Sequence, residues 1–286
     1  MVWALFGIAA VLALVLERIS SRRRTVQKRQ RRLKALEQIR LLRLLLEQVQ
    51  RHRGLCFGVM AGESSLESQR WKVEAQVNHC LEAVAVHEGS LFWYTAWHPV
   101  VPIWEEIGAQ RQHHASAEAV LQLHHRMADH LINTIEALGN RHDLLCLGAL
   151  APQPQGMWLE LLKNTELLGR ARAVGTGIAA RRQNSALQHQ ELQRLREQIN
   201  SQCYQPLARL CTEPLLRLSM EKPVRAAEES LDSLLAAVDL LLQSRDKPGL
   251  PSNRYFNIAT QAISAKLAIV DLLLDRLQAP GALAFR

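Results

Sequence analysis

Apolar residues recur every three or four positions through most of this 286-residue chain, and this spacing constrains its fold more than any other feature. They form one helical face between residues 42 and 60 and a second stripe between residues 231 and 242. Glycine and proline are scarce, and no segment alternates apolar and polar residues as a half-buried strand does. The pattern therefore predicts an all-α protein built from helix bundles.

The breaks between apolar stretches divide the chain into helices joined by short turns. After a helical pattern that begins near residue 29, we expect helices at about 65–88, 105–138, 157–201, 206–218, 224–244 and 252–277. The stretch 89–104 is aromatic and holds two prolines, which predicts a packed connection. The segment 151–156, Ala-Pro-Gln-Pro-Gln-Gly, is the clearest internal break.

The first sixteen residues carry no charge and are almost wholly apolar. A helix of sixteen residues spans roughly 24 Å, and its continuation to residue 19 nearly matches the roughly 30 Å hydrocarbon core of a bilayer. No basic residue precedes the apolar run and no small-residue cleavage site follows it, which argues against a cleaved signal peptide. We expect residues 1–19 to form a transmembrane anchor; a core helix of a soluble protein is the alternative.

A basic cluster follows the apolar run and accounts for the excess positive charge of the chain. Residues 1–53 hold thirteen Lys and Arg against three Glu, whereas residues 54–286 hold 22 Lys and Arg against 24 Asp and Glu. The near-neutral body argues against nucleic-acid binding. Basic residues beside a membrane span stay in the cytoplasm, so we expect a single-pass protein of the cytoplasmic (inner) membrane with its bulk in the cytoplasm. The residues expected to meet membrane lipids at the surface are Arg22, Arg23, Arg24, Lys28, Arg29, Arg31 and Arg32.

A weak internal repeat relates residues 47–61 to residues 166–180, at an offset of 119 positions, and places Arg53 and Arg172 at equivalent positions. Each lies on an apolar part of its helix with no acid three or four residues away. A buried guanidinium keeps its proton, so each must find a carboxylate, carbonyl groups or a bound anion. An acid from a neighbouring helix is one solution, and a small-anion pocket between helices is the functional one.

The neighbouring arginines have the opposite pattern. Arg51 follows Glu47 by four residues, and Arg170 follows Glu166 by four. This spacing is typical of ion pairs on a solvated helix face. We therefore expect Arg51 and Arg170 to be paired at the surface and to take no part in an anion site.

Histidines and cysteines form no catalytic or metal-binding motif. The five cysteines have no C-x-x-C spacing and are expected to be free thiols, most of them buried. No H-E-x-x-H, no inward Glu-x-x-His pair, no glycine-rich phosphate loop and no G-x-S-x-G occurs. We expect no metal, no cofactor and no enzymatic activity, and a bundle metalloenzyme is the least favoured function. A polar helix face is the preferred interpretation of His113, His114, His124, His125 and His130.

The region around Arg53 resembles the opening of the nitrate- and nitrite-sensing (NIT) domain family. That family begins with an L-Q-x-E-R-G-like motif followed downstream by Q-R, and His52 stands where the family usually has Glu. The matching positions are Gln50, Arg53, Gly54, Gln69 and Arg70.

Two further segments extend this resemblance to roughly residues 42–278. Gly169, Arg172 and Ala173 match a second family motif of the type K-E-x-x-G-x-E-R-A, from which Ala171 departs. Residues 253–277 resemble the last helix of the family. The resemblance implies two up-down four-helix bundles sharing long helices and a nitrate or nitrite ion held by Arg53 and Arg172.

These expectations combine into one organisation: an anchor at 1–19, a basic juxtamembrane helix at 20–41, a NIT-like sensor domain at 42–278 and a tail at 279–286. The predicted anchor and the resemblance together indicate a membrane-anchored sensory protein that binds a small oxyanion. Family members usually carry an output domain; here we expect the output in a protein partner, and a homodimer is left open. The alternative is a ligand-free helical adaptor tethered to the membrane.

Overall fold

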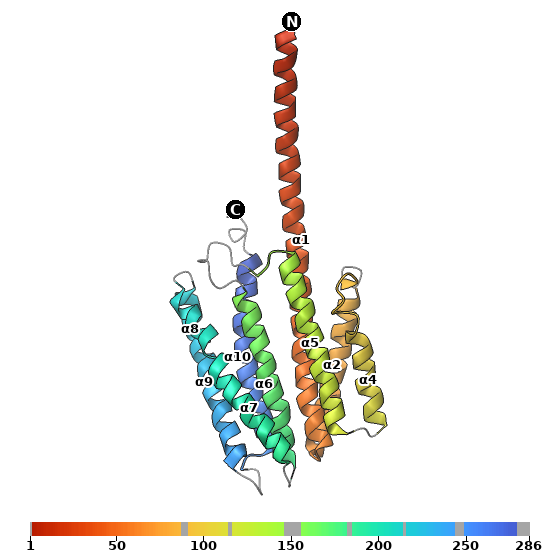
Figure 1. The fold of residues 1–286 in the computed structure, drawn as a ribbon, viewed down its shortest axis with the longest axis vertical. Helices are drawn as coiled ribbons and strands as arrows, with labels where there is room; N and C mark the ends of the chain where they lie inside the picture. The colour runs from red at the N-terminus through yellow and green to blue at the C-terminus, as the bar shows by residue number, and fades with distance from the viewer. Residues whose placement is uncertain are drawn as a thin grey trace.

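The computed structural model describes residues 2–86, 91–113, 116–145, 156–181, 185–213, 216–243 and 249–278, with the backbone alone for residues 2–13 and 15. All regular elements in these segments are helical, which confirms the predicted all-α class. The helices form two neighbouring bundles, and one very long helix extends beyond both of them (Figure 1).

The first bundle contains the long helix α1 (Val2–Met60) and the helices that return along it. A short 3₁₀ turn, η1 (Ser64–Leu66), leads into α2 (Glu67–Ala85). Helices α4 (Val100–Gln112) and α5 (Ala117–Arg141) complete the bundle. The carboxyl-terminal half of α1 packs against α2 and α5, and α4 packs against α5. The apolar face predicted between residues 42 and 60 lies inside this bundle.

The second bundle repeats the up-down arrangement. It consists of α6 (Met157–Ala180), α7 (Ala186–Gln202), the short α8 (Gln205–Thr212), α9 (Arg217–Gln243) and α10 (Ser252–Gln278). Helix α10 packs between α6 and α9, and α7 packs against α6. The predicted stripe at 231–242 faces the core of this bundle through its buried positions, which are Leu231, Leu234, Val238 and Leu241.

The two bundles meet where α1 lies along α6, with α10 also touching α1. Gln50 of α1 lies beside Gly169 of α6, and Phe57 lies beside Gly177, so the two helices run in the same direction. The two segments of the internal repeat are thus the final turns of the first helix in each bundle. The sequence repeat corresponds to a repeat of architecture.

Two predicted helices are wrong in the same way, because each is two helices. The segment predicted at 105–138 contains the end of α4 and most of α5, and Ser116 caps the start of α5 by accepting a hydrogen bond from the Ala119 N–H at 3.1 Å. The segment predicted at 157–201 contains both α6 and α7. Neither break has a proline or a glycine that would mark it in the sequence.

Helix α9 begins earlier than predicted. It starts at Arg217 rather than near residue 224, and it includes Pro223. A proline is tolerated in the first turn of a helix, but its missing N–H removes a hydrogen bond further in. Here Pro223 lies two turns from the start, and the buried Met220 and Val224 beside it hold the helix against the core.

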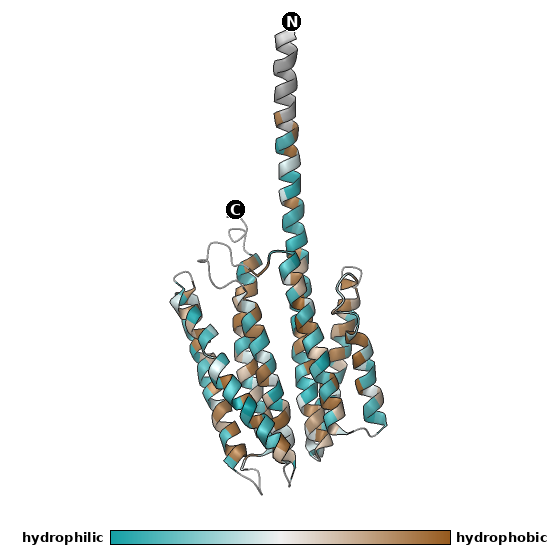
Figure 2. Ribbon diagram, in the orientation of Figure 1, coloured by the Kyte–Doolittle hydropathy of each residue, from teal (hydrophilic) through white to brown (hydrophobic). Residues whose placement is uncertain are grey.

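The amino-terminal part of α1 projects beyond both bundles, and its polar stretch is visible in Figure 2. The side chains of the predicted anchor, residues 1–19, lie largely outside the described residues. Among the described residues, one helix is long and apolar enough to cross a membrane, namely α10. Half of its most apolar window is buried inside the protein, at 50%, and the helix packs against α6 and α9. Its apolar residues are therefore accounted for by packing in the core of the second bundle.

Candidate functional site

Arg53 forms a buried ion pair with an acid from the other bundle. Its Nη1 donates to Glu166 Oε1 at 2.6 Å, and its Nη2 donates to Glu166 Oε2 at 3.1 Å. Glu166 also accepts from Arg170 Nε at 2.8 Å and from Gln50 Nε2 at 3.0 Å. Burial alone would raise the pKa of Glu166, but the charges and hydrogen bonds of Arg53 and Arg170 hold it below its ordinary value. The bidentate pair connects α1 to α6.

Arg172 is equally buried but has no carboxylate partner in the described part of the chain. Its one hydrogen bond there runs from Nη1 to the Thr260 hydroxyl of α10, at 3.0 Å. Its guanidinium carbon lies 5.0 Å from the centre of the Phe256 ring, and its Nε has no acceptor. A cation–π contact and one neutral hydroxyl compensate a buried charge only in part.

The electrostatic cost of Arg172 is visible in its pKa. Burial, together with the nearby charges of Arg53 and Arg51, lowers the pKa of Arg172 to about 9. A guanidinium still carries its proton at neutral pH. The direction of this shift is the one expected for a buried cation with other cations nearby.

A glycine lies near each of the two arginines, on the opposite helix in each case. A Cβ on Gly169 of α6 would lie 2.6 Å from Arg53 Nη2. A Cβ on Gly54 of α1 would lie 3.5 Å from Arg172 Nε and 3.0 Å from the Phe256 ring. The contact at Gly169 leaves no space for a methyl group beside Arg53. At Gly54 the tight contact is with the Phe256 ring, whereas the distance to Arg172 is an ordinary one, so Gly54 makes room for the ring that lies against Arg172.

A pair of buried histidines lies next to Arg53. His52 Nδ1 and His124 Nε2 are 2.9 Å apart, and His124 Nδ1 donates to the Val120 carbonyl at 2.8 Å. The proton on His124 Nδ1 leaves its Nε2 as acceptor, so His52 Nδ1 is the donor between the rings. His52 Nε2 then has no hydrogen-bond partner and lies 3.8 Å from Glu74 Oε2. His52 takes part in a packed, neutral chain of hydrogen bonds.

The prediction of a polar helix face for the histidines is wrong for two of them. His124 is fully buried, and burial lowers its pKa well below the ordinary value. Burial and the charge of Arg53 lower the pKa of His125 to about 3. His114 lies outside the described residues. Within the described segments, no group of three or more His, Cys, Asp or Glu side chains could hold a metal ion.

The predicted surface pairs are also partly wrong. Glu47 is paired with Arg43 rather than with Arg51, and Arg51 Nε is buried without an acceptor. The Arg170–Glu166 pair does form, but Glu166 is buried at 5% exposure and serves Arg53 as well. The sequence analysis therefore missed Glu166. Its burial could have been read from Leu162, Gly169 and Ala173, which lie four residues before it and three and seven residues after it.

The residues predicted to meet the membrane lie far from Arg53 along α1, toward its projecting end. Arg22, Arg23, Arg24, Lys28, Arg29 and Arg31 are exposed, and Arg32 is half-buried. Lys28 Nζ lies 3.2 Å from Asp143 Oδ2, and Arg32 Nη2 donates to the Asp143 carbonyl at 2.9 Å. The chain thus separates a buried arginine site from a basic surface, on one continuous helix.

Comparison with known proteins places this geometry in a family. The sequence model of the family described as nitrate and nitrite sensing matches residues 44–278. The chain belongs to this family. The match begins shortly before Gln50 and ends with α10, so it covers both bundles and the Arg53 and Arg172 positions.

A solved structure has the same fold as this NIT-family chain. The structure of the NasR transcription antiterminator superposes with a TM-score of 0.59 over 92% of this chain and 73% of that chain. The two sequences are 19% identical, so the likeness concerns the fold. No curated protein is similar in sequence to this chain.

Proposed function

We propose that this NIT-family chain is a membrane-anchored sensor that binds nitrate, nitrite or a similar small oxyanion between α1, α6 and α10. Arg172 is the principal ligand, Arg53 is the second, and the bound state is relayed to a protein partner. No chemical conversion of the anion is part of this proposal.

The observation that carries the proposal is the uncompensated charge of Arg172. Arg53 and Arg51 are close enough to disfavour the charge of Arg172, and Glu166 is shared by Arg53 and Arg170. A monovalent anion beside Arg172 would supply the missing negative charge. Nitrate and nitrite suit a guanidinium because their oxygens can accept parallel hydrogen bonds from its fork.

Arg53 contributes the N–H of Nε, the one guanidinium nitrogen that does not donate to Glu166. Glu166 occupies both terminal nitrogens of Arg53, while its Nε–H is buried without an acceptor. Arg172 also has an Nε–H without an acceptor. The proposed anion takes donors from both arginines while Glu166 keeps the α1–α6 pair intact.

The relay follows from how tightly the site is closed. Arg172 is enclosed by Gly54, Phe256 and Thr260, so an anion reaches it only when α1, α6 and α10 move slightly apart. A ligand that binds one packing better than the other shifts the balance between them. Helix α1 is continuous from Arg53 to its projecting end, so about 50 Å of rigid helix connects the site to residue 20.

The membrane part of the proposal rests on the projecting helix. Leu14 and Leu16 are 62% and 65% exposed, and apolar side chains that stand off the fold mark a surface that something else covers. The proposed domains are the anchor at 1–19, the basic helix at 20–41, the sensor at 42–278 and the tail at 279–286. The basic residues would hold the body on the cytoplasmic side of the inner membrane.

One observation favours the alternative of a ligand-free adaptor. The charge of Arg53 is already balanced by an internal acid, which accepts from both of its terminal nitrogens. An adaptor with this fold would use the bundles as a rigid platform, and Arg172 would be a tolerated cost. The two functions differ in what happens when Arg172 loses its charge.

The deciding experiment measures thermal unfolding of the full chain in micelles of a neutral detergent. Sodium nitrate, nitrite, chloride and sulfate are compared at equal ionic strength. We expect nitrate or nitrite to raise Tm more than chloride does. Arg172→Met should abolish this difference while leaving the ligand-free Tm unchanged or higher, because an uncompensated buried charge is removed.

Arg196→Met is the matched control, because Arg196 of α7 pairs with Asp239 of α9 within the second bundle and does not contact Arg172. It should keep the full nitrate response. An equal response to all four salts, or a nitrate response that survives in Arg172→Met, would leave the adaptor as the better function.

A further inference from the structure

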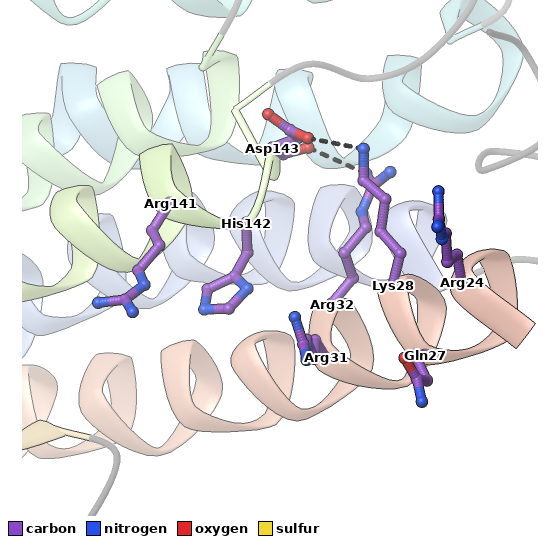
Figure 3. A pocket seen from close by; sticks show the side chains of 8 residues that line it. All are labelled: Arg24, Gln27, Lys28, Arg31, Arg32, Arg141, His142 and Asp143. Carbon is purple, nitrogen blue, oxygen red and sulfur yellow. Dashed lines mark hydrogen bonds and ion pairs between the residues drawn. The ribbon is translucent and has the colours of Figure 1, made fainter.

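We propose that a phosphate-bearing anion binds in a second, separate site, a basic pocket between α1 and the carboxyl end of α5. The pocket has a volume of about 540 Å³. Its charged lining comprises Arg24, Lys28, Arg31, Arg32, Arg141 and Asp143, shown in Figure 3. This site does not depend on the proposed nitrate site, since the two share no residue.

Helical spacing brings the α1 cations to one side of that helix. Arg24, Lys28 and Arg32 follow one another at intervals of four, and Arg31 follows Lys28 by three. The residues between them that face away, such as Arg29, do not line the pocket. The pocket therefore uses a chosen subset of the basic cluster.

The opposite wall comes from the folded body. The Arg141 guanidinium carbon lies 5.7 Å from the centre of the Tyr94 ring, and Tyr94 is buried. Asp143, two residues after the end of α5, has a left-handed backbone with φ of 53°. This turn presents its carbonyl to Arg32 at 2.9 Å and its carboxylate to Lys28 at 3.2 Å. Tertiary contacts thus give the pocket a second wall, which a charge run on a lone helix would not have.

The charges in the pocket are unbalanced. Five permanent cations face one carboxylate among the lining residues. His142, also in the lining, reports the same potential: burial and then the charges of Arg141 and Arg31 lower its pKa. The carboxyl end of α5 carries a partial negative charge, but this is only about half an elementary charge. The side chains determine the sign of the site.

Charge and size together indicate a phosphate group. Arginines and a lysine on two walls of one pocket match the negatively charged oxygens of a phosphate group, whether it is a diester or carries further charge. A volume in the range of ordinary ligand pockets exceeds what one small inorganic ion needs. The anion is therefore a phosphate ester or a diphosphate, either a lipid head group or a soluble molecule.

The test uses the full chain in micelles of a neutral detergent and titration calorimetry at fixed ionic strength. The probes are sodium pyrophosphate for the soluble source and dioctanoyl phosphatidylglycerol for the lipid source, with dioctanoyl phosphatidylcholine as the comparison without net charge. The pocket variant is Arg31→Gln/Arg141→Gln. The control variant, Arg23→Gln/Arg29→Gln, removes the same charge from exposed residues that do not line the pocket.

We expect the pocket variant to bind the preferred probe about tenfold more weakly, because the loss of one well-formed charged contact lowers affinity by about a factor of ten. The affinity of the control variant should stay within about twofold of that of the unchanged protein. Tighter binding of the phosphatidylglycerol identifies a lipid source, and tighter binding of pyrophosphate a soluble one. Equal losses in both variants would show that overall charge acts and would overturn the proposal, as would no binding of either probe. Ligand-free Tm of both variants, measured alongside, excludes unfolding as the cause.

Discussion

Arg53 and Arg172 hold equivalent positions in the repeat, yet their surroundings divide the work of the site between them. Arg53 donates hydrogen bonds from both terminal nitrogens to Glu166, and this pair joins α1 to α6. Arg172 has a hydroxyl and an aromatic face and is left with excess charge. A structural ion pair beside an unsatisfied cation is an arrangement in which fold stability and ligand binding can be altered separately.

Glu166→Gln should destabilise the fold strongly. The substitution keeps the volume but leaves Arg53 without a counter-charge in the core, which typically costs about 3–5 kcal/mol. The free energy of unfolding, from urea titration of the full chain in neutral micelles, measures the effect. Glu191→Gln removes an exposed partner of Arg194 and should change stability by less than about 1 kcal/mol. A loss below 1 kcal/mol for Glu166→Gln would contradict the buried pair.

Stability should fall as the pH drops below about 6.5, the ordinary pKa of histidine. The pKa of His125 is lowered to about 3, so between these values the unfolded chain binds a proton that the folded chain does not. The stabilising contribution is complete above pH 6.5 and is lost progressively toward pH 3, with a slope up to about 1.4 kcal/mol per pH unit for each such histidine. His52 and His124 have lowered pKa values and add to the same slope.

Urea unfolding at pH 7, 6 and 5 measures this slope. His125→Gln should reduce it, whereas His79→Gln, at a side chain that is 84% exposed, should not. An unchanged slope in His125→Gln would show that this ring is not buried and neutral in solution.

The burial of both arginines could be predicted from the sequence, but the partner of Arg53 could not. Helical spacing placed Arg53 among Val49, Cys56 and Phe57, and that environment is correct. Glu166 lies 113 positions away on another helix, and which helices meet is decided by tertiary packing. Because Glu166 lies four residues before Arg170, its spacing predicts a pair with Arg170 alone and gives no sign of its pairing with Arg53 in the core.

At the scale of elements, small residues determine how closely α1, α6 and α10 approach. Gly177 of α6 lies against the Phe57 ring of α1, and Gly58 of α1 lies against the Thr176 methyl group of α6. Gly175 lies against the Tyr255 ring of α10, whose hydroxyl donates to the Ala171 carbonyl at 2.9 Å. These contacts bring three helix backbones together around Arg172.

Gly177→Ala should therefore destabilise the protein despite the better helix propensity of alanine. The new methyl group would overlap the Phe57 ring, and overpacking of this kind costs about 1–3 kcal/mol. Gly108→Ala in α4 is the control, because a Cβ there meets nothing within 4 Å. It should raise stability by up to about 1 kcal/mol. Opposite signs in thermal unfolding are expected, and stabilisation by both would refute the close packing of α1 and α6.

The predicted helices were correct where apolar periodicity was strong and wrong where two helices join without a glycine or a proline. The predicted start of α9 was also wrong, because Pro223 lies inside that helix rather than before it. The start of α5 did have a local signal, since Ser116 precedes Ala117 and Glu118 as an N-cap precedes a first turn with an acid. The continuous apolar pattern on both sides outweighed it. Which of two compatible patterns a segment adopts depends on whether the chain must reverse to bury its next apolar face.

At the scale of the whole molecule, the two bundles share a plan and differ at their first helix. Both α1 and α6 lead their bundle and run side by side in the same direction, but only α1 continues far beyond the bundles (Figure 1). In the proposed relay, a change in packing at the α1–α6 contact is therefore transmitted along α1, the one of these two helices that extends beyond the bundles. The sequence indicated this plan through its repeat, whereas the side-by-side placement needed the structure.

The amino-terminal end of α1 is proposed to anchor the chain in the membrane. The full chain should sediment with membranes and stay there in about 1 M salt, where the Debye length is only about 3 Å and purely electrostatic docking is released. Deletion of residues 1–20 should move the chain to the soluble fraction. Leu187→Arg/Leu218→Arg alters exposed apolar side chains of the body and should leave the chain in the membrane fraction. Release of the full chain by salt would mean that the basic residues alone hold it, as a peripheral protein. Its presence in the soluble fraction at low salt would rule out both the anchor and the relay along α1 to the membrane.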